Sequence, residues 1–221
     1  MKQGFTLAET LITIGIIGVV AAMTLPVIIA KYQEIEFATA FKKIYSELQN
    51  SIDYITLSNG ITECYTYFPE GVGSYQRKTQ DCEQLFSNIV EKLQLTKGRD
   101  SLRNLYTDSS TVYANGGEAI NRTCSYDYVL RRSDVYTTKN GMTLFLNSIT
   151  YASIIIDVNG EKGPNKWGYD TFFMMLTNHN EKTNRILLTD EMCSIVEKGG
   201  KLPRAILRNE KENTDFSIFW Q

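Results

Sequence analysis

The sequence predicts an α+β fold, in which a long N-terminal helix, transmembrane in its lower half, packs on an antiparallel β-sheet head domain. Three observations lead to this prediction. Residues 5–30 are almost entirely apolar, residues 31–59 continue with apolar side chains at helical spacing, and the apolar period changes to two after residue 95. Helices followed by strands in this order are typical of α+β architecture.

The apolar segment, residues 5–30, is long enough to cross a membrane. At a rise of about 1.5 Å per residue, a helix of this length spans a hydrocarbon core of about 30 Å. The apolar region of a secretory signal peptide is shorter. No second segment of this kind follows. We therefore expect one transmembrane helix, with residues 31–221 forming an extracytoplasmic domain that includes the upper part of the helix.

Glu9 is the one charged residue in this apolar segment. A carboxylate costs roughly 2.5 kcal/mol near the centre of a transmembrane helix, and less near its end. A residue that carries this cost is typically a residue with a partner or a function. A plain signal-anchor helix would have no use for it.

The N-terminal residues resemble the prepilin leader of type IV pilins and type II secretion pseudopilins. The similarity consists of Met1-Lys2-Gln3-Gly4, then Phe5-Thr6-Leu7-Ala8-Glu9, and then the apolar run. The resemblance implies that residues 1–4 are a leader, and that prepilin peptidase cuts between Gly4 and Phe5 and methylates the amine of Phe5. It also implies that Glu9 pairs with the N-terminal amine of a neighbouring subunit and sets the axial register during assembly.

Gly15, Gly18 and Pro26 lie inside the apolar segment. In a helix interior, glycine costs about 1 kcal/mol relative to alanine and proline about 3 kcal/mol. Such residues indicate close helix packing or a kink. The resemblance implies that the helix can unwind between Gly18 and Pro26 in an assembled filament. A simple kink at Pro26 is an equally compatible alternative.

Beyond Lys31 the pattern predicts an amphipathic continuation of the helix, which ends at Asn59-Gly60. Its polar face is expected to carry Lys42, Lys43, Glu47, Gln49 and Asn50. Its apolar stripe recurs at three- and four-residue steps and comprises Ile35, Phe37, Phe41, Ile44, Tyr45, Leu48, Ile52 and Ile55.

A second helix is predicted over residues 81–95, and strands follow it. A hairpin turn is expected at Lys139-Asn140-Gly141, between two of these strands. The strand predictions rest on β-branched and aromatic residues with a period of two, and they are 126–131, 135–139, 142–147, 151–158, 171–177 and 185–189.

The four cysteines, Cys64, Cys82, Cys124 and Cys193, all follow the membrane segment. An even number in a translocated domain favours two disulfides, and four cysteines allow three connectivities. We favour Cys64–Cys82, which would close the loop after the long helix, and Cys124–Cys193. Free, buried cysteines are the alternative. A zinc site is not expected, because no C-x-x-C is present.

The segment 157–170 follows an apolar strand and contains candidate calcium ligands. Asp157, Asn159 and Glu161 alternate around a turn glycine, and Asp170 could complete the shell. Calcium is the one candidate cofactor, and the resemblance supports it in that some type II pseudopilins hold calcium in a loop near the C-terminal sheet. The alternative is an Asx-rich turn whose side chains bond their own backbone.

Other function classes find little support. The net charge of -2 gives no electrostatic case for nucleic-acid binding. The chain has a single histidine, His179, and none of the familiar hydrolase motifs, so we do not expect an enzyme. The expected function is that of a subunit of a type IV pilus or a type II secretion pseudopilus. It would reside in the bacterial inner membrane and then in an extracellular or periplasmic filament with other subunits. The alternative is a single-pass, membrane-anchored binding domain.

Overall fold

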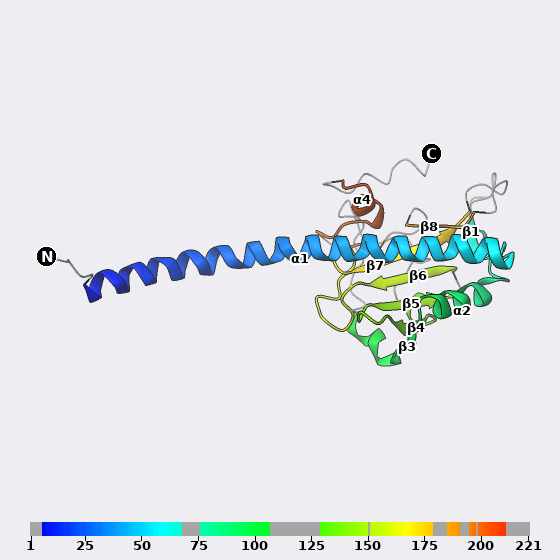
Figure 1. Cartoon of the computed structure of the whole chain (residues 1–221), viewed down its shortest axis with the longest axis horizontal. Coiled ribbons are helices and arrows are strands. Elements are labelled where there is room, and N and C mark those ends of the chain that lie inside the picture. Colours follow the sequence, from blue (N-terminus) through cyan, green and yellow to red (C-terminus); the bar gives the residue numbers. More distant parts are fainter. Residues whose placement is uncertain are drawn as a thin grey trace. The chain divides into compact units, whose positions relative to one another are not determined.

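The computed structural model describes residues 6–67, 76–106, 129–149, 151–178, 185–190, 195–197 and 199–210. The chain divides into two compact units, Met1–Glu36 and Phe37–Gln221 (Figure 1). Helix α1, Leu7–Asn59, contributes to both. The domain boundary predicted after residue 30 falls inside the first unit.

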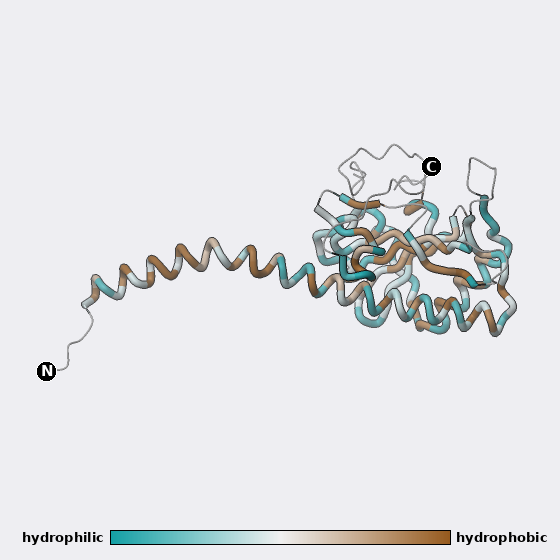
Figure 2. The backbone as a smooth tube through the Cα atoms, turned by 90° about the horizontal axis from the view of Figure 1, so that it is seen from above, coloured by the Kyte–Doolittle hydropathy of each residue, from teal (hydrophilic) through white to brown (hydrophobic). Residues whose placement is uncertain are grey.

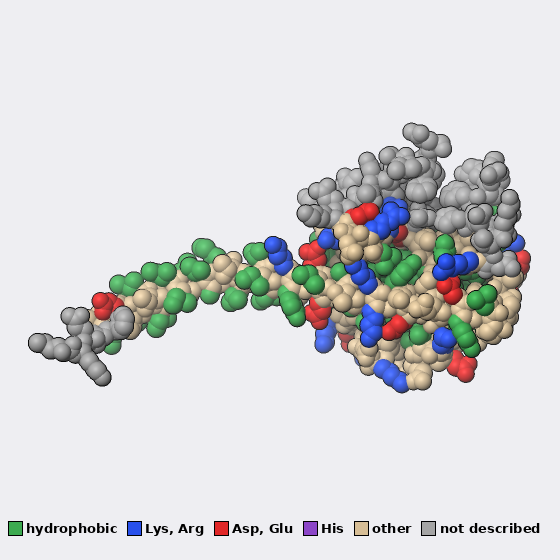
Figure 3. Space-filling model, turned by 45° about the horizontal axis from the view of Figure 1, so that its top comes forward, with side chains coloured by type: hydrophobic (Ala, Val, Ile, Leu, Met, Phe, Trp, Pro, Cys, Tyr) green, Lys and Arg blue, Asp and Glu red, His purple; other side chains and the backbone are tan. Residues whose placement is uncertain are grey.

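The first unit consists of the lower part of α1. Its apolar side chains are exposed along its length. Figure 2 shows the hydrophobic residues recurring along the helix backbone, and Figure 3 shows hydrophobic side chains on its surface. α1 is the one described helix that is long and apolar enough to cross a membrane. Ile35, the first residue of the predicted apolar stripe, is 65% exposed and lies in this unit. The helical spacing of apolar residues includes Ile35, but the stripe packs against the core only from Phe37 onward.

In the second unit, the upper part of α1 packs as the sequence predicts. Its buried apolar side chains are Phe41, Ile44, Leu48, Ile52 and Ile55. Phe37 and Tyr45 are partly buried against the same core. The helix ends at Asn59, and Gly60 follows with a φ of 65°, a left-handed conformation that glycine adopts without a Cβ clash.

Gln49, predicted on the polar face, is instead buried. Its Nε2 donates to the carbonyl oxygen of Ile186 (3.0 Å), and the N–H of Leu188 donates to its Oε1 (2.8 Å). The side-chain amide therefore forms the same kind of hydrogen bonds with the backbone of residues 186 and 188 as a neighbouring β-strand would form. An apolar residue at position 49 would leave these buried groups without partners.

The described strands form one eight-stranded sheet, ordered β2-β1-β7-β6-β5-β4-β3, with β8 paired to β7. α2, Cys82–Lys92, and the short α4, Pro203–Leu207, accompany it, together with the 3₁₀ helix η1, Asp100–Leu105. The strands are β1 (Tyr65–Tyr67), β2 (Gln76–Lys78), β3 (Thr96–Lys97), β4 (Asp134–Thr137), β5 (Thr143–Asn147), β6 (Ser153–Asp157), β7 (Thr171–Thr177) and β8 (Leu187–Thr189).

The α+β prediction is confirmed, but the sheet is mixed rather than antiparallel. β1 pairs with β7 in parallel, and the other strand pairs are antiparallel. Five of the predicted strands are present as β4 to β8, and the hairpin at Lys139–Gly141 joins β4 to β5. The strand predicted over 126–131 is wrong in its described part, because Val129 and Leu130 are helical.

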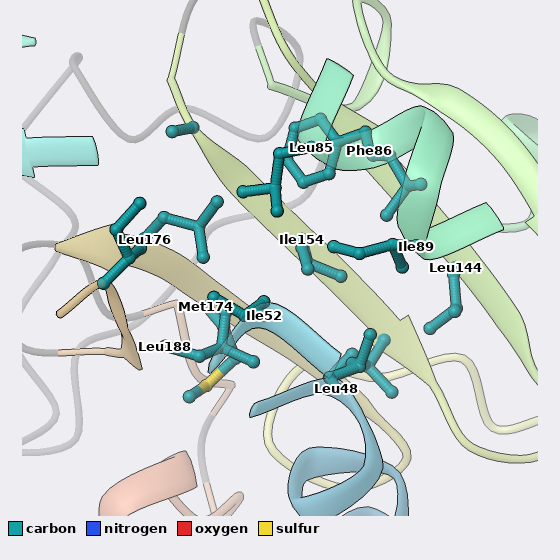
Figure 4. Packing of buried hydrophobic residues seen from close by; sticks show 14 of the residues in the cluster. Leu48, Ile52, Leu85, Phe86, Ile89, Leu144, Ile154, Met174, Leu176 and Leu188 are labelled. Atoms are coloured by element: carbon teal, nitrogen blue, oxygen red, sulfur yellow. The ribbon is translucent and has the colours of Figure 1, made fainter. Parts of the chain in front are cut away.

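The sheet has an apolar core on each face, because successive side chains of a strand point to opposite sides. Ile154 of β6 and Met174 of β7 face α1 and α2, whereas Ile155 and Phe173 belong to a second cluster with Trp167. Figure 4 shows the first core, in which side chains of α1, α2, β5, β6, β7 and β8 converge. Burial on both faces holds the ends of β6 and β7 in place.

A disulfide joins Cys64 to Cys82, as predicted, and ties the segment after α1 to the start of α2. Asp81, next to it, accepts hydrogen bonds from the backbone N–H groups of Thr62 and Glu63, both at 2.9 Å. Cys124 and Cys193 lie outside the described residues. Val129 and Ile195, which follow them closely in sequence, share the second apolar cluster. The Cys124–Cys193 bond stays a prediction.

Removing the Cys64–Cys82 bond is expected to destabilise the head domain by about 3 kcal/mol, because the bond closes a loop of 18 residues in the unfolded chain. The test is urea unfolding of residues 31–221 carrying Cys64→Ala and Cys82→Ala, compared with the oxidised parent. Cys64→Ser with Cys82→Ser is a second removal that changes the packing differently. An unfolding midpoint equal to that of the parent in both double variants would contradict the expectation.

Candidate functional site

Thr6 and Glu9 form a reciprocal capping box at the first turn of α1. The N–H and the Oγ1 of Thr6 donate to Glu9 Oε2 at 2.9 and 2.8 Å. In return, the N–H of Glu9 donates to Thr6 Oγ1 at 3.3 Å. Both side chains are exposed, and each satisfies a backbone donor that a helix start leaves unpaired. Glu9 therefore has a partner within its own chain, Thr6, in addition to the partner that the resemblance implies.

The structure describes only some of the other residues to which the N-terminal resemblance assigns a role. Gly4 and Phe5 lie outside the described residues. Gly18 and Pro26 both lie within α1, which the structure forms without a break. A Cβ at Gly15 or Gly18 would meet no atom of the chain within 4 Å. Packing within the described chain therefore does not require these glycines, and unwinding or kinking in a filament stays a prediction.

A second candidate site lies where β6 ends and β7 begins. Asp157 and Asp170 are fully buried there. Asp157 Oδ1 accepts hydrogen bonds from the N–H groups of Asn159 (3.0 Å) and Gly160 (2.8 Å), and its Oδ2 accepts one from the hydroxyl of Tyr106. The N–H of Val158 donates to the carbonyl oxygen of Asp170 (2.9 Å), which brings the two strand ends together.

The carboxylate of Asp170 holds the far side of the same loop. Its Oδ2 accepts from the N–H of Asn165 (2.8 Å) and its Oδ1 from the N–H of Lys166 (2.7 Å). Gly160 has a φ of 65°, and a Cβ there would lie 2.1 Å from the carbonyl oxygen of Gly141. Only glycine fits this approach. The loop is therefore shaped around its two aspartates, as the Asx-turn alternative describes.

Placing two carboxylates side by side in a buried site perturbs both. Burial, reinforced by the neighbouring Asp170 and opposed by the hydrogen bond from Tyr106, raises the pKa of Asp157 to about 7. Burial also raises the pKa of Asp170, against the hydrogen bonds from Lys166 and Asn165. In the described part of the chain neither carboxylate forms a salt bridge. A bound proton or a cation would offset the negative charge of this pair.

The side-chain amides of Asn159 and Asn165 lie close to these carboxylates. The Oδ1 of Asn159 is buried and has no hydrogen-bond partner. One end of the Asn165 side-chain amide lies 3.3 Å from Asp157 Oδ2 and 3.1 Å from the carbonyl oxygen of Gly160. Both neighbours of this end are hydrogen-bond acceptors, so it is the amide nitrogen, which donates to both oxygens.

Of the four predicted ligands, the structure brings Asp157, Asn159 and Asp170 together. The Asn159 side chain also holds the loop, because its Nδ2 donates to the carbonyl oxygen of Gly163 (3.0 Å). Glu161 is instead about half exposed and pairs with Arg99. Consistent with this, no group of three His, Cys, Asp or Glu side chains suited to a metal exists among the described residues.

Asn165 also belongs to this site, although the sequence pattern does not indicate it. The alternating polar residues end before position 165. Asn165 has a φ of 52°, a left-handed conformation at which the chain changes direction. The remaining donor set of carboxylate, amide and carbonyl oxygens fits calcium and does not suit zinc.

Comparison of the chain with protein-family models, with curated proteins and with solved structures finds no match.

Proposed function

We propose that this chain is a structural filament subunit of the type IV pilus or type II secretion class. The observation that supports the proposal most is Gly4-Phe5-Thr6-Leu7-Ala8-Glu9 placed directly before an exposed apolar helix. The exposed side chains run from Leu7 to Ile29, a length that suits one crossing of a bilayer. Lys31 and Tyr32 then follow, residue types that are common at a membrane surface.

In this proposal, the subunit first resides in the bacterial inner membrane with residues 31–221 outside the cytoplasm. Prepilin peptidase removes residues 1–4 and methylates Phe5. Thr6 holds the Glu9 carboxylate at the start of α1 until assembly. In the filament, Glu9 then pairs with the amine of a neighbouring Phe5, because an unpaired carboxylate among apolar helices is costly.

The decisive experiment is intact-mass analysis of the protein taken from the cell envelope. We expect a mature chain that begins at Phe5, lacks Met1–Gly4 and carries one added methyl group. Peptide sequencing would place the methyl group on the Phe5 amine. A full-length, unmethylated chain would overturn the proposal and favour the membrane-anchored binding domain, which has no need of processing.

We also propose that the loop 157–170 binds calcium. The supporting observation is the pair of buried carboxylates, Asp157 and Asp170, beside the unpartnered Oδ1 of Asn159. Asp157, Asn159 and the Gly160 carbonyl could hold the ion, with Asp170 organising the loop from the other side. Bound calcium would supply positive charge where the described chain has none, and would fix the ends of β6 and β7.

Calcium is expected to raise the melting temperature of residues 31–221, because an ion that binds the folded state alone stabilises it by mass action. The measurement compares melts in millimolar calcium with melts in chelator. Asn159→Ala should remove most of the shift, since it deletes the buried amide oxygen that has no hydrogen-bond partner. Glu161→Gln is the matched control and should keep the shift. Equal melting temperatures in calcium and chelator would leave the loop as an Asx turn.

The same melts have an expected pH dependence. The pKa of Asp157 in the folded state, about 7, lies above its ordinary value of 3.8, so the folded state binds a proton that the unfolded state has lost. The resulting stabilisation is complete below pH 4 and is lost as the pH rises through 7. In chelator the melting temperature should therefore fall from pH 5 to pH 8. Calcium should reduce this fall, because it replaces the proton.

A further inference from the structure

We draw no further inference here: the strongest candidate, the exposed face at the upper end of α1 formed by Tyr54 and Leu57 beside Lys92, carries nothing because no feature of the structure shows what covers it.

Discussion

Replacing Gly4 with leucine is expected to block processing and to leave the full-length precursor in the membrane. The resemblance to prepilins places the cut bond directly after Gly4. A glycine lets an enzyme approach the backbone closely, and a branched side chain at this position would obstruct that approach. We expect almost none of the variant to be cut. The apolar helix that inserts the chain is unchanged, so the precursor should still reach the membrane.

The measurement is the mass of the membrane-bound protein, with and without its first four residues. Gln3→Leu is the matched control, since it places the same side chain one residue away from the cut bond, and it should be processed normally. If Gly4→Leu were also shortened to Phe5, the position of the cut would be wrong. If neither variant nor the parent were shortened, the prepilin interpretation itself would fail.

Glu9→Ala is expected to insert into the membrane and to be processed, but to assemble into filaments at least tenfold less than the parent. Removal of the carboxylate lowers the cost of insertion, so the precursor should accumulate normally. The same change deletes the charge that would pair with the neighbouring Phe5 amine. The amount of protein in sheared filaments, relative to the amount in the membrane, measures the defect.

The capping box gives Glu9 a second role, and Glu9→Gln separates the two. Glutamine can occupy the same position of a capping box and bond to Thr6, but it carries no charge. If charge pairing drives assembly, Glu9→Gln should fail as Glu9→Ala does. If the only role of Glu9 is to start α1, Glu9→Gln should restore assembly, and the proposed pairing would be wrong.

Thr6→Val supplies the converse test. It removes the hydroxyl that bonds Glu9 Oε2 and leaves the carboxylate in place. The loss of a helix cap typically costs about 1 kcal/mol. We therefore expect assembly to be reduced much less than by Glu9→Ala. A defect as large as that of Glu9→Ala would assign Glu9 to helix capping instead.

The sequence by itself determined the elements whose signal is local. The apolar segment and the stripe from Phe41 to Ile55 depend only on helical periodicity, and the structure confirms the helix and its end at Asn59, before Gly60. The central strands β5, β6 and β7 are runs of apolar residues bounded by turns, and they were predicted within two residues. Glu9 and the aspartates of the 157–170 loop also stand out locally, as carboxylates that adjoin apolar runs.

The tertiary structure alone decided features that depend on residues far apart in the chain. β1, β2 and β3 have two or three residues each, too few for a periodic signal, and they are strands because a neighbouring strand is available. Gln49 is buried because its side-chain amide forms hydrogen bonds with the backbone of residues 186 and 188, at β8. The Asn165 side chain lies against Asp157 because the loop reverses direction between the two residues. Glu161 instead forms an ion pair with Arg99 at the surface. The partners of Gln49 and Glu161 are 139 and 62 residues away, so the spacing of nearby residues does not predict these contacts.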